Sequence, residues 1–244
     1  MHSRYLKSFI LSLLSVLTLT ACGGGGGGST PAVVNTPPTD LDAFSLLPAK
    51  SLAASTSTFN LSGRDNTGTQ YSATLTIINT PNIGNINGKV INRVQSNVTL
   101  INTTADPDVT ATTSGSSYYT SDYILSYIVD EDNQITCTPI QGTYMAPPDS
   151  AKVNDNGSLA TLTCADKDKV PTNTAIVITW RLDAGATADE AKFVVTQASS
   201  VSGNPDSTEV DSYIIDHAGN IKSIEVVVTK GVIIRTLSGP KLTQ

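Results

Sequence analysis

Side-chain alternation dominates this sequence from about residue 56 to its end. In the clearest run, residues 176–183, the even-numbered side chains are Ile, Ile, Trp and Leu, whereas three of the four odd-numbered ones are polar. A period of two is typical of a strand with one buried face. Because no apolar stripe at helical spacing persists over three turns, the sequence predicts an all-β chain. Similar runs occupy residues 71–79, 89–103, 122–130, 134–140, 158–164, 191–199, 208–216, 221–230 and 232–237.

Five turn signals of one form separate these runs. Each begins with Asp or Asn, whose side chain can accept hydrogen bonds from its own turn, and each ends with Gly or Asn, which tolerate a left-handed backbone. This is the chemistry of a type I turn with a bulge between two antiparallel strands. The signals stand at residues 65–68, 85–88, 130–133, 154–157 and 216–219.

The order of strands and turns predicts one antiparallel β domain over residues 53–244. Consecutive hairpin signals in its second half favour a meander, either a curled sheet or an open barrel. The alternative is a pair of immunoglobulin-like sandwiches with a break near residues 106–115.

The first 21 residues have the build of a secretory signal peptide. Arg4 and Lys7 supply the positive charge, and an apolar run of 11 residues follows at 9–19. As a helix this run would measure about 16 Å, too short for a hydrocarbon core of about 30 Å. A cleaved signal is therefore expected rather than a membrane span.

Leu19, Thr20, Ala21 and Cys22 close this segment and resemble the lipobox of bacterial lipoproteins. The resemblance implies cleavage before Cys22 and lipidation of its side chain, with several acyl chains that hold far more firmly than one. In that family a residue other than Asp after the cysteine often accompanies sorting to the Gram-negative outer membrane, and Gly23 fits. The resemblance thus implies a protein lipid-anchored at the outer membrane, facing the periplasm or the cell surface.

Residues 22–52 are expected to form a linker, since six glycines follow Cys22 and prolines recur further on. Glycine resists ordering and proline stiffens the chain, so the linker should act as a leash. Within it, residues 40–47 could dock on the domain or form one helical turn.

Charge narrows the possible partners. The whole chain has 15 basic and 21 acidic residues, and removing Arg4 and Lys7 with the signal leaves 13 against 21, a net charge of −8. No Lys/Arg cluster suggests a phosphate track, so nucleic acid is a poor candidate. The membrane, an envelope protein or an apolar ligand are the partners that we expect.

A search for catalytic and metal-binding patterns yields little. After cleavage His217 is the only histidine, it falls in a predicted turn, and no Gly-x-Ser-x-Gly motif accompanies it. One histidine and two spaced cysteines do not make a zinc site, and the acidic turns at 130–133 and 166–168 do not match a calcium loop. Four tyrosines at 118, 119, 123 and 127 are expected on sheet faces or in the core. We therefore expect no enzyme, cofactor or metal, although a carboxylate pair formed only in space is invisible to a sequence.

A second resemblance concerns the stretch from residue 158 to residue 220. The segments Gly-Ser-Leu at 157–159, Thr-Cys-Ala-Asp at 163–166 and Thr-Glu-Val-Asp-Ser-Tyr at 208–213 resemble uncharacterised β-rich lipoproteins of Gram-negative bacteria. The resemblance supports the envelope location and carries no mechanism. Two functions stay open: a non-catalytic structural or partner-binding lipoprotein, and a lipocalin-like carrier of an apolar ligand.

The remaining two cysteines form an even pair. Cys137 follows Ile135 by two residues and Cys164 follows Leu162 by two, so both have the inward phase of their strands. With Cys22 lipidated and the compartment oxidising, a Cys137–Cys164 disulfide is expected across the loop at 141–157.

Replacement of Cys22 by serine tests the lipobox. Because the hydroxyl cannot carry the thioether-linked lipid, the Cys22→Ser protein should leave the membrane fraction and appear in the soluble one. Fractionation and immunoblotting measure this, and mature protein that stays membrane-bound would refute the anchor.

Overall fold

The structure is a computed structural model that describes residues 43–46, 54–105, 107–121 and 123–242. The predicted signal peptide, Cys22 and most of the expected linker lie outside these residues. Strands and turns make up the described chain, and no helix within it is long and apolar enough to cross a membrane.

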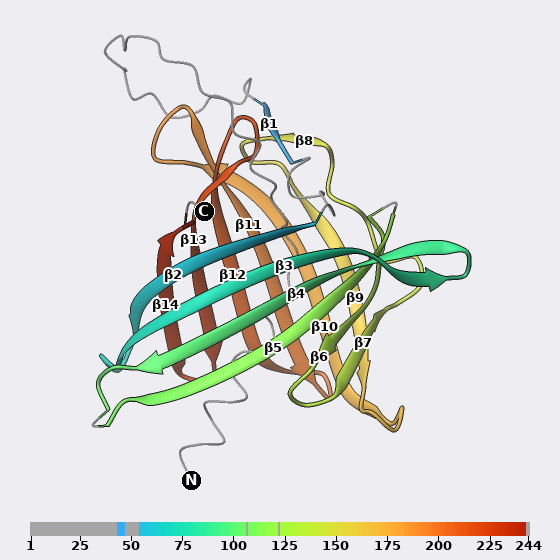
Figure 1. The fold of residues 1–244 in the computed structure, drawn as a ribbon, viewed down its shortest axis with the longest axis horizontal. Helices are drawn as coiled ribbons and strands as arrows, with labels where there is room; N and C mark the ends of the chain where they lie inside the picture. The colour runs from blue at the N-terminus through green and yellow to red at the C-terminus, as the bar shows by residue number, and fades with distance from the viewer. Residues whose placement is uncertain (1–42, 47–53, 106, 122, 243–244) are drawn as a thin grey trace.

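Twelve strands form a closed antiparallel barrel in which successive barrel strands pair with each other and β8 is left out, so that β7 pairs with β9 (Figure 1). The predicted all-β meander is confirmed, and the sheet closes completely because β14 pairs with β2. The barrel strands are β2 (Ser55–Asp65), β3 (Gln70–Ile86), β4 (Lys89–Asn102), β5 (Val109–Thr120), β6 (Leu125–Asp130), β7 (Ile135–Pro139), β9 (Asn156–Ala165), β10 (Pro171–Ala184), β11 (Glu190–Val201), β12 (Asn204–Asp216), β13 (Ile221–Lys230) and β14 (Ile233–Pro240).

The two-sandwich alternative is not what the chain adopts. Strand β5 begins at Val109, inside the stretch where a break between sandwiches was considered, and pairs with both β4 and β6. One sheet therefore runs through this region.

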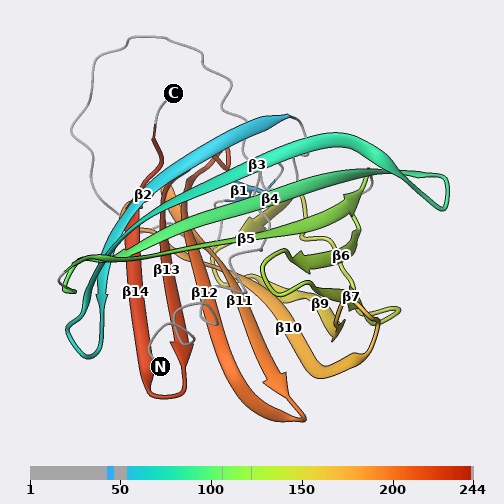
Figure 2. The same ribbon diagram turned by 60° about the horizontal axis from the view of Figure 1, so that its bottom comes forward.

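The turns between successive strands alternate between the two ends of the barrel. We call the end with the turns after β2, β4, β6, β9, β11 and β13 the lower end, which lies toward the bottom of Figure 1, and the opposite end the upper end. The β3–β4 hairpin extends beyond the barrel to one side (Figures 1 and 2), where Ile83 and Ile86 are about 40% exposed.

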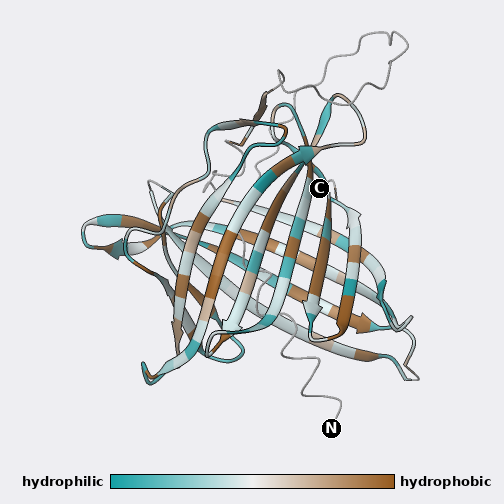
Figure 3. Cartoon of the chain, turned by 180° about the vertical axis from the view of Figure 1, so that it is seen from behind, coloured by the Kyte–Doolittle hydropathy of each residue, from teal (hydrophilic) through white to brown (hydrophobic). Residues whose placement is uncertain are grey.

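The interior of the barrel is its hydrophobic core. Alternate residues point inward and are buried, as in β10, where Ile178 and Leu182 are buried and the intervening Thr179 and Arg181 are exposed. Figure 3 shows this alternation of apolar and polar residues along the strands. The apolar side chains fill most of the upper half of the barrel, where Phe193, Ile224 and Leu182 are almost fully buried.

Glycines permit the closure between β2 and β14. Gly63 pairs with Leu237, and a Cβ at Gly63 would overlap the backbone carbonyl oxygen of Thr236. A Cβ at Gly239 would likewise overlap the carbonyl oxygen of Asn60. Only residues without side chains let the two strands approach this closely.

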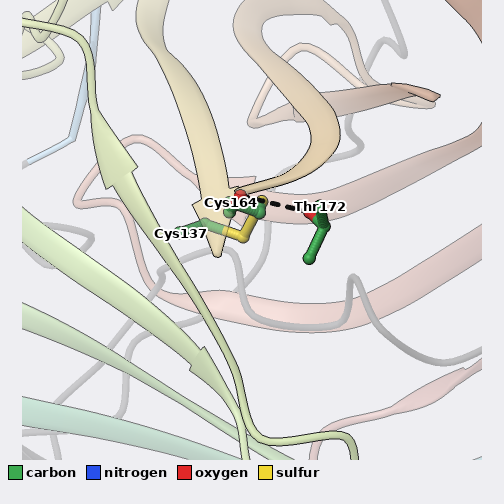
Figure 4. The surroundings of a disulfide bond; sticks show 3 residues. All are labelled: Cys137, Cys164 and Thr172. Carbon is green, nitrogen blue, oxygen red and sulfur yellow. Dashed lines mark hydrogen bonds between the residues drawn. A yellow bond between two sulfur atoms is a disulfide. The ribbon is translucent and has the colours of Figure 1, made fainter. Parts of the chain in front are cut away.

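The disulfide between Cys137 and Cys164 is present, as the sequence predicted (Figure 4). The two residues are direct cross-strand partners of β7 and β9, and both are 4% exposed. The Thr172 hydroxyl donates a hydrogen bond to the carbonyl oxygen of Cys164 at 3.1 Å, which links this pair to the start of β10.

A small second sheet covers the upper end. Strand β1 (Ala43–Ser45) pairs with β8 (Ser150–Lys152), a strand within the loop that connects β7 to β9. Phe44 is fully buried and stacks on the His217 ring at 4.2 Å, and the Ser45 amide donates to the His217 carbonyl oxygen. The described part of the expected docking segment thus docks as a strand rather than a helical turn.

Most predicted turns have the expected chemistry. The Asp65 Oδ1 accepts from the amides of Thr67 and Thr69, and Gly68 and Gly219 adopt positive φ. The signal at residues 154–157 is different: it lies between β8 and β9, which do not pair with each other. No hairpin forms there, because β8 pairs with β1 instead of with β9.

Substitution of Gly63 by alanine should disrupt the closure. A methyl group would push against backbone rather than a movable side chain, so we expect a loss of about 3 kcal/mol in the free energy of unfolding. Gly84→Ala is the matched control, because a Cβ there meets no atom within 4 Å. Chemical denaturation of both variants measures this, and equal stabilities would contradict the closure.

Removal of the disulfide should also destabilise the fold. The bridge spans a sequence separation of 27 residues, for which the chain-entropy estimate is about 3–4 kcal/mol. The Cys137→Ser/Cys164→Ser protein should therefore melt at a lower temperature than the unreduced parent. Thiol labelling of the denatured, unreduced parent at these two cysteines should find neither free, and two labelled thiols would rule out the bridge.

Candidate functional site

The lower end of the barrel opens into a pocket of about 260 Å³. Inward-facing residues of β10, β11 and β12 form most of its wall, and the β6–β7 turn closes one side. The lining combines amides, hydroxyls and one charge of each sign with three apolar side chains: Asn133, Ile135, Thr174, Ile176, Gln197, Ser199, Val201, Asp206, Ser207 and Lys230.

Polar contacts organise the rim of this pocket. The Lys230 Nζ lies 3.7 Å from the Asp206 Oδ2, and the hydroxyls of Ser199 and Ser207 are hydrogen-bonded at 2.8 Å. Deeper in the pocket, Gln197 is 4% exposed. A polar molecule that enters would therefore meet a rim ion pair first and then hydroxyl and amide groups.

Two acidic residues lie above the pocket on the inward face of β12. Glu209 and Asp211 are 1% and 2% exposed, and Glu209 pairs across the strands with Gln197. Burial and the nearby Glu209 raise the pKa of the Asp211 carboxyl well above its ordinary value. Its Oδ1 has no hydrogen-bond partner among the residues described. Asp211 is therefore a group that the folded barrel prefers to keep protonated.

Arg235 belongs to the same layer. Strand register places Glu209 opposite Val228, Val228 opposite Arg235, and Arg235 opposite Asp65. The buried guanidinium lies over the Tyr71 ring at 4.0 Å, a cation–π arrangement. Tyr71 in turn donates to the Asp65 Oδ2 at 3.0 Å.

Asp65 differs from Asp211 in its surroundings. Burial acts to raise its pKa, but hydrogen bonds from the Thr67 hydroxyl, Tyr71 and the amides of Thr67 and Thr69 outweigh burial and lower the pKa. The lower half of the barrel thus holds one carboxylate stabilised in its charged form and one carboxyl that burial favours in its neutral form.

The other candidates from the sequence are scattered. His217 is exposed in the β12–β13 turn, where it stacks on Phe44 at the upper end, away from the pocket. The Asp130 and Asp166 carboxylates accept backbone amides of their own turns. No group of three potential metal ligands occurs among the described residues.

The tyrosines separate into two pairs. Tyr119 and Tyr123 stack at 5.0 Å and are buried in the barrel, whereas Tyr118 and Tyr127 stack at 4.2 Å and are only half-buried. The first pair therefore lies in the core and the second on a sheet face, the two placements that were expected from the sequence.

Glu209 and Asp211 were not singled out from the sequence. The sequence did contain a signal for them. Glu209 and Asp211 stand at odd-numbered positions of the same strand as Tyr213 and Ile215, and these alternate positions point into the barrel. An acid at an inward position of a strand is costly to bury, so it merits attention as a site candidate.

Comparisons of this chain with protein-family models, curated proteins and solved structures find no match. The site must therefore be interpreted from its own geometry.

Replacement of Asp211 by asparagine should change how stability depends on pH. Because the folded state raises the pKa of Asp211, it binds a proton that the unfolded chain has already released. The stability of the parent therefore falls as the pH rises from the ordinary carboxyl pKa toward the raised one.

Asp211→Asn removes this ionisation, so its melting temperature should exceed that of the parent increasingly as the pH rises above about 4. Melting curves from pH 4 to 8 measure the difference. A constant difference across this range would show that Asp211 ionises as readily in the folded as in the unfolded chain.

Proposed function

We propose that this protein is a non-catalytic binding lipoprotein of the bacterial outer membrane, held by a lipid on Cys22. The observation that carries the proposal is the placement of the two ends. Strand β1, which follows the anchor segment in the chain, docks at the upper end, and the polar pocket opens at the lower end.

This placement separates the anchor segment from the pocket. Residues 23–42 connect Cys22 to β1, and even when fully extended they reach no further than about 70 Å. The proposed tether thus attaches to the upper end and leaves the pocket at the opposite end of the barrel free of it. A binding site at the far end of a tethered barrel suits a partner that approaches from the aqueous side.

The chemistry of the pocket supports a polar partner. Its hydroxyls, amides and the Lys230–Asp206 pair can exchange hydrogen bonds with a polar small molecule or with side chains of an envelope protein. The net negative charge of the chain disfavours nucleic acid as the partner.

The second candidate is a lipocalin-like carrier of an apolar ligand. A separate cavity in the upper half favours it, because the lining consists of apolar and tyrosine side chains. That cavity measures about 30 Å³, room for about one water molecule, so a ligand would enter only if the surrounding structure moved.

Two neighbouring residues of β11 provide a test of the first proposal. Ser199 lines the lower pocket, whereas Ala198 faces outward and is exposed. Ser199→Arg should therefore obstruct the pocket, and Ala198→Arg adds the same side chain to the opposite face.

The lipidated parent and both variants are cross-linked in intact cells and purified, and the attached molecules are identified by mass spectrometry. We expect a partner that accompanies the parent and Ala198→Arg and is lost from Ser199→Arg. A set of attached molecules that is the same for all three proteins would contradict a function at this pocket.

A further inference from the structure

The wall of the barrel contains a seam in its upper half, between β6 and β9. Strand β7 fills the space between them only lower down, where Ile128–Asp130 of β6 pair with Ile135–Cys137. On its other side β7 pairs with β9 only from Leu162 to Ala165. Figure 1 shows how short β6 and β7 are beside their neighbours.

The loop after β7 closes this seam. Its backbone is bonded to β9, since the Ile140 amide donates to the Thr161 carbonyl and the Met145 amide to the Leu159 carbonyl, both at 2.8 Å. Toward β6, the Tyr144 hydroxyl donates to the carbonyl oxygen of Tyr123. The loop is thus joined to one margin of the seam by its backbone and reaches the other through a side chain.

The apolar cavity lies directly behind this closure. Tyr144 and Pro147 of the loop and Leu159 of β9 line it at the closure, and the rest of its wall comes from barrel strands and the β5–β6 turn. The remaining lining residues are Tyr119, Tyr123, Leu125, Ala160, Ile178, Phe193 and Val195.

The lining is uncharged. Burial raises the pKa of Tyr119, Tyr123 and Tyr144 above the ordinary tyrosine value, so all three phenols stay neutral at physiological pH. Aliphatic and ring surfaces in this arrangement favour an apolar molecule, because a charged one would lose its hydration without finding a partner.

Two further observations mark the seam. Tyr123 has a φ of 61°, a left-handed conformation that is unfavourable for a bulky side chain and is found where surrounding structure enforces it. On the outer surface Ile124, Ile140 and Met145 are 40%, 43% and 58% exposed, so apolar side chains flank the closure from outside as well.

We propose that this seam is a lateral portal, latched by Tyr144 and Tyr123, through which a small apolar ligand enters the upper half of the barrel. When the latch opens, the Tyr144 ring swings out and the ligand occupies the space next to Tyr119 and Phe193. This inference rests on the carrier alternative above and specifies its ligand as a hydrocarbon chain or a small aromatic ring.

The single tryptophan of the chain reports on the site. Trp180 lies with its ring 5.9 Å from that of Phe193, which lines the cavity. The apolar dye N-phenyl-1-naphthylamine should therefore quench Trp180 emission when it binds. The mature chain from residue 22 onward, carrying Cys22→Ser, serves as the parent, because without the signal peptide and the lipid it needs no detergent that would take up the dye.

Stopped-flow mixing then measures the rate of uptake. Tyr144→Phe keeps the ring and removes the latching hydroxyl, so uptake should accelerate about three- to tenfold. Tyr144→Ala should enlarge the cavity and bind the dye more tightly. Tyr118→Phe is the matched control, since Tyr118 stacks on Tyr127 away from the cavity and should leave the rate unchanged.

The alternatives give different results. If the dye quenches Trp180 but Tyr144→Phe does not change the rate, the portal is refuted and the carrier function stands; slower uptake by Ser199→Arg would then place the entry at the lower end. Absence of quenching in the parent and in Tyr144→Ala would overturn both the portal and the carrier function. Displacement of bound dye by a fatty acid or by indole would identify the ligand as a lipid chain or a small ring, respectively.

Discussion

Closure of the sheet is the constraint on which this structure depends. An open sheet of this length would expose two edges and one apolar face, whereas the β2–β14 pairing removes both edges and turns the apolar face into an enclosed core. The pairing joins strands that are far apart in the chain, so forming it costs more loop entropy than forming a hairpin between consecutive strands. Gly63 and Gly239 make it possible because the carbonyl groups of the facing strand occupy the space where side chains would be.

The closed wall creates two environments from one sheet. The upper half is packed with apolar and aromatic side chains and covered by β1 and β8, and the lower half holds Asp65, Arg235, Glu209 and Asp211 next to an open pocket. Polar groups in such a layer need partners or protonation to be tolerated, which the Asp65–Tyr71–Arg235 contacts and the raised pKa of Asp211 provide. The wall is least regular at β6 and β7, and the disulfide fastens β7 to β9 beside the seam.

The sequence predicted the parts of this fold that carry a period of two. Residues 176–183 lie within a strand as expected. Cys137 and Cys164, the two cysteines that remain besides Cys22, were correctly predicted to form a disulfide. Strand β5 escaped notice because its inward positions include Thr113, Gly115 and Ser117, which show no apolar alternation. Closure could not be predicted, since Gly63 and Gly239 have meaning only once their strands face each other. The same holds for Glu209, whose layer with Arg235 is set by register across three strands.

Native-state hydrogen exchange of the full chain tests the closed barrel most directly. In a closed barrel the hydrogen-bonded amides of the β2–β14 pair, around Gly63 and Leu237, exchange with solvent only when the structure opens. Their exchange should therefore be slow. Their protection should match that of the β10–β11 pair around Ile178 and Thr196, which is interior to the sheet in any arrangement. Fast amide exchange confined to β2 and β14 would show that the sheet is open there and that the barrel interior is not enclosed.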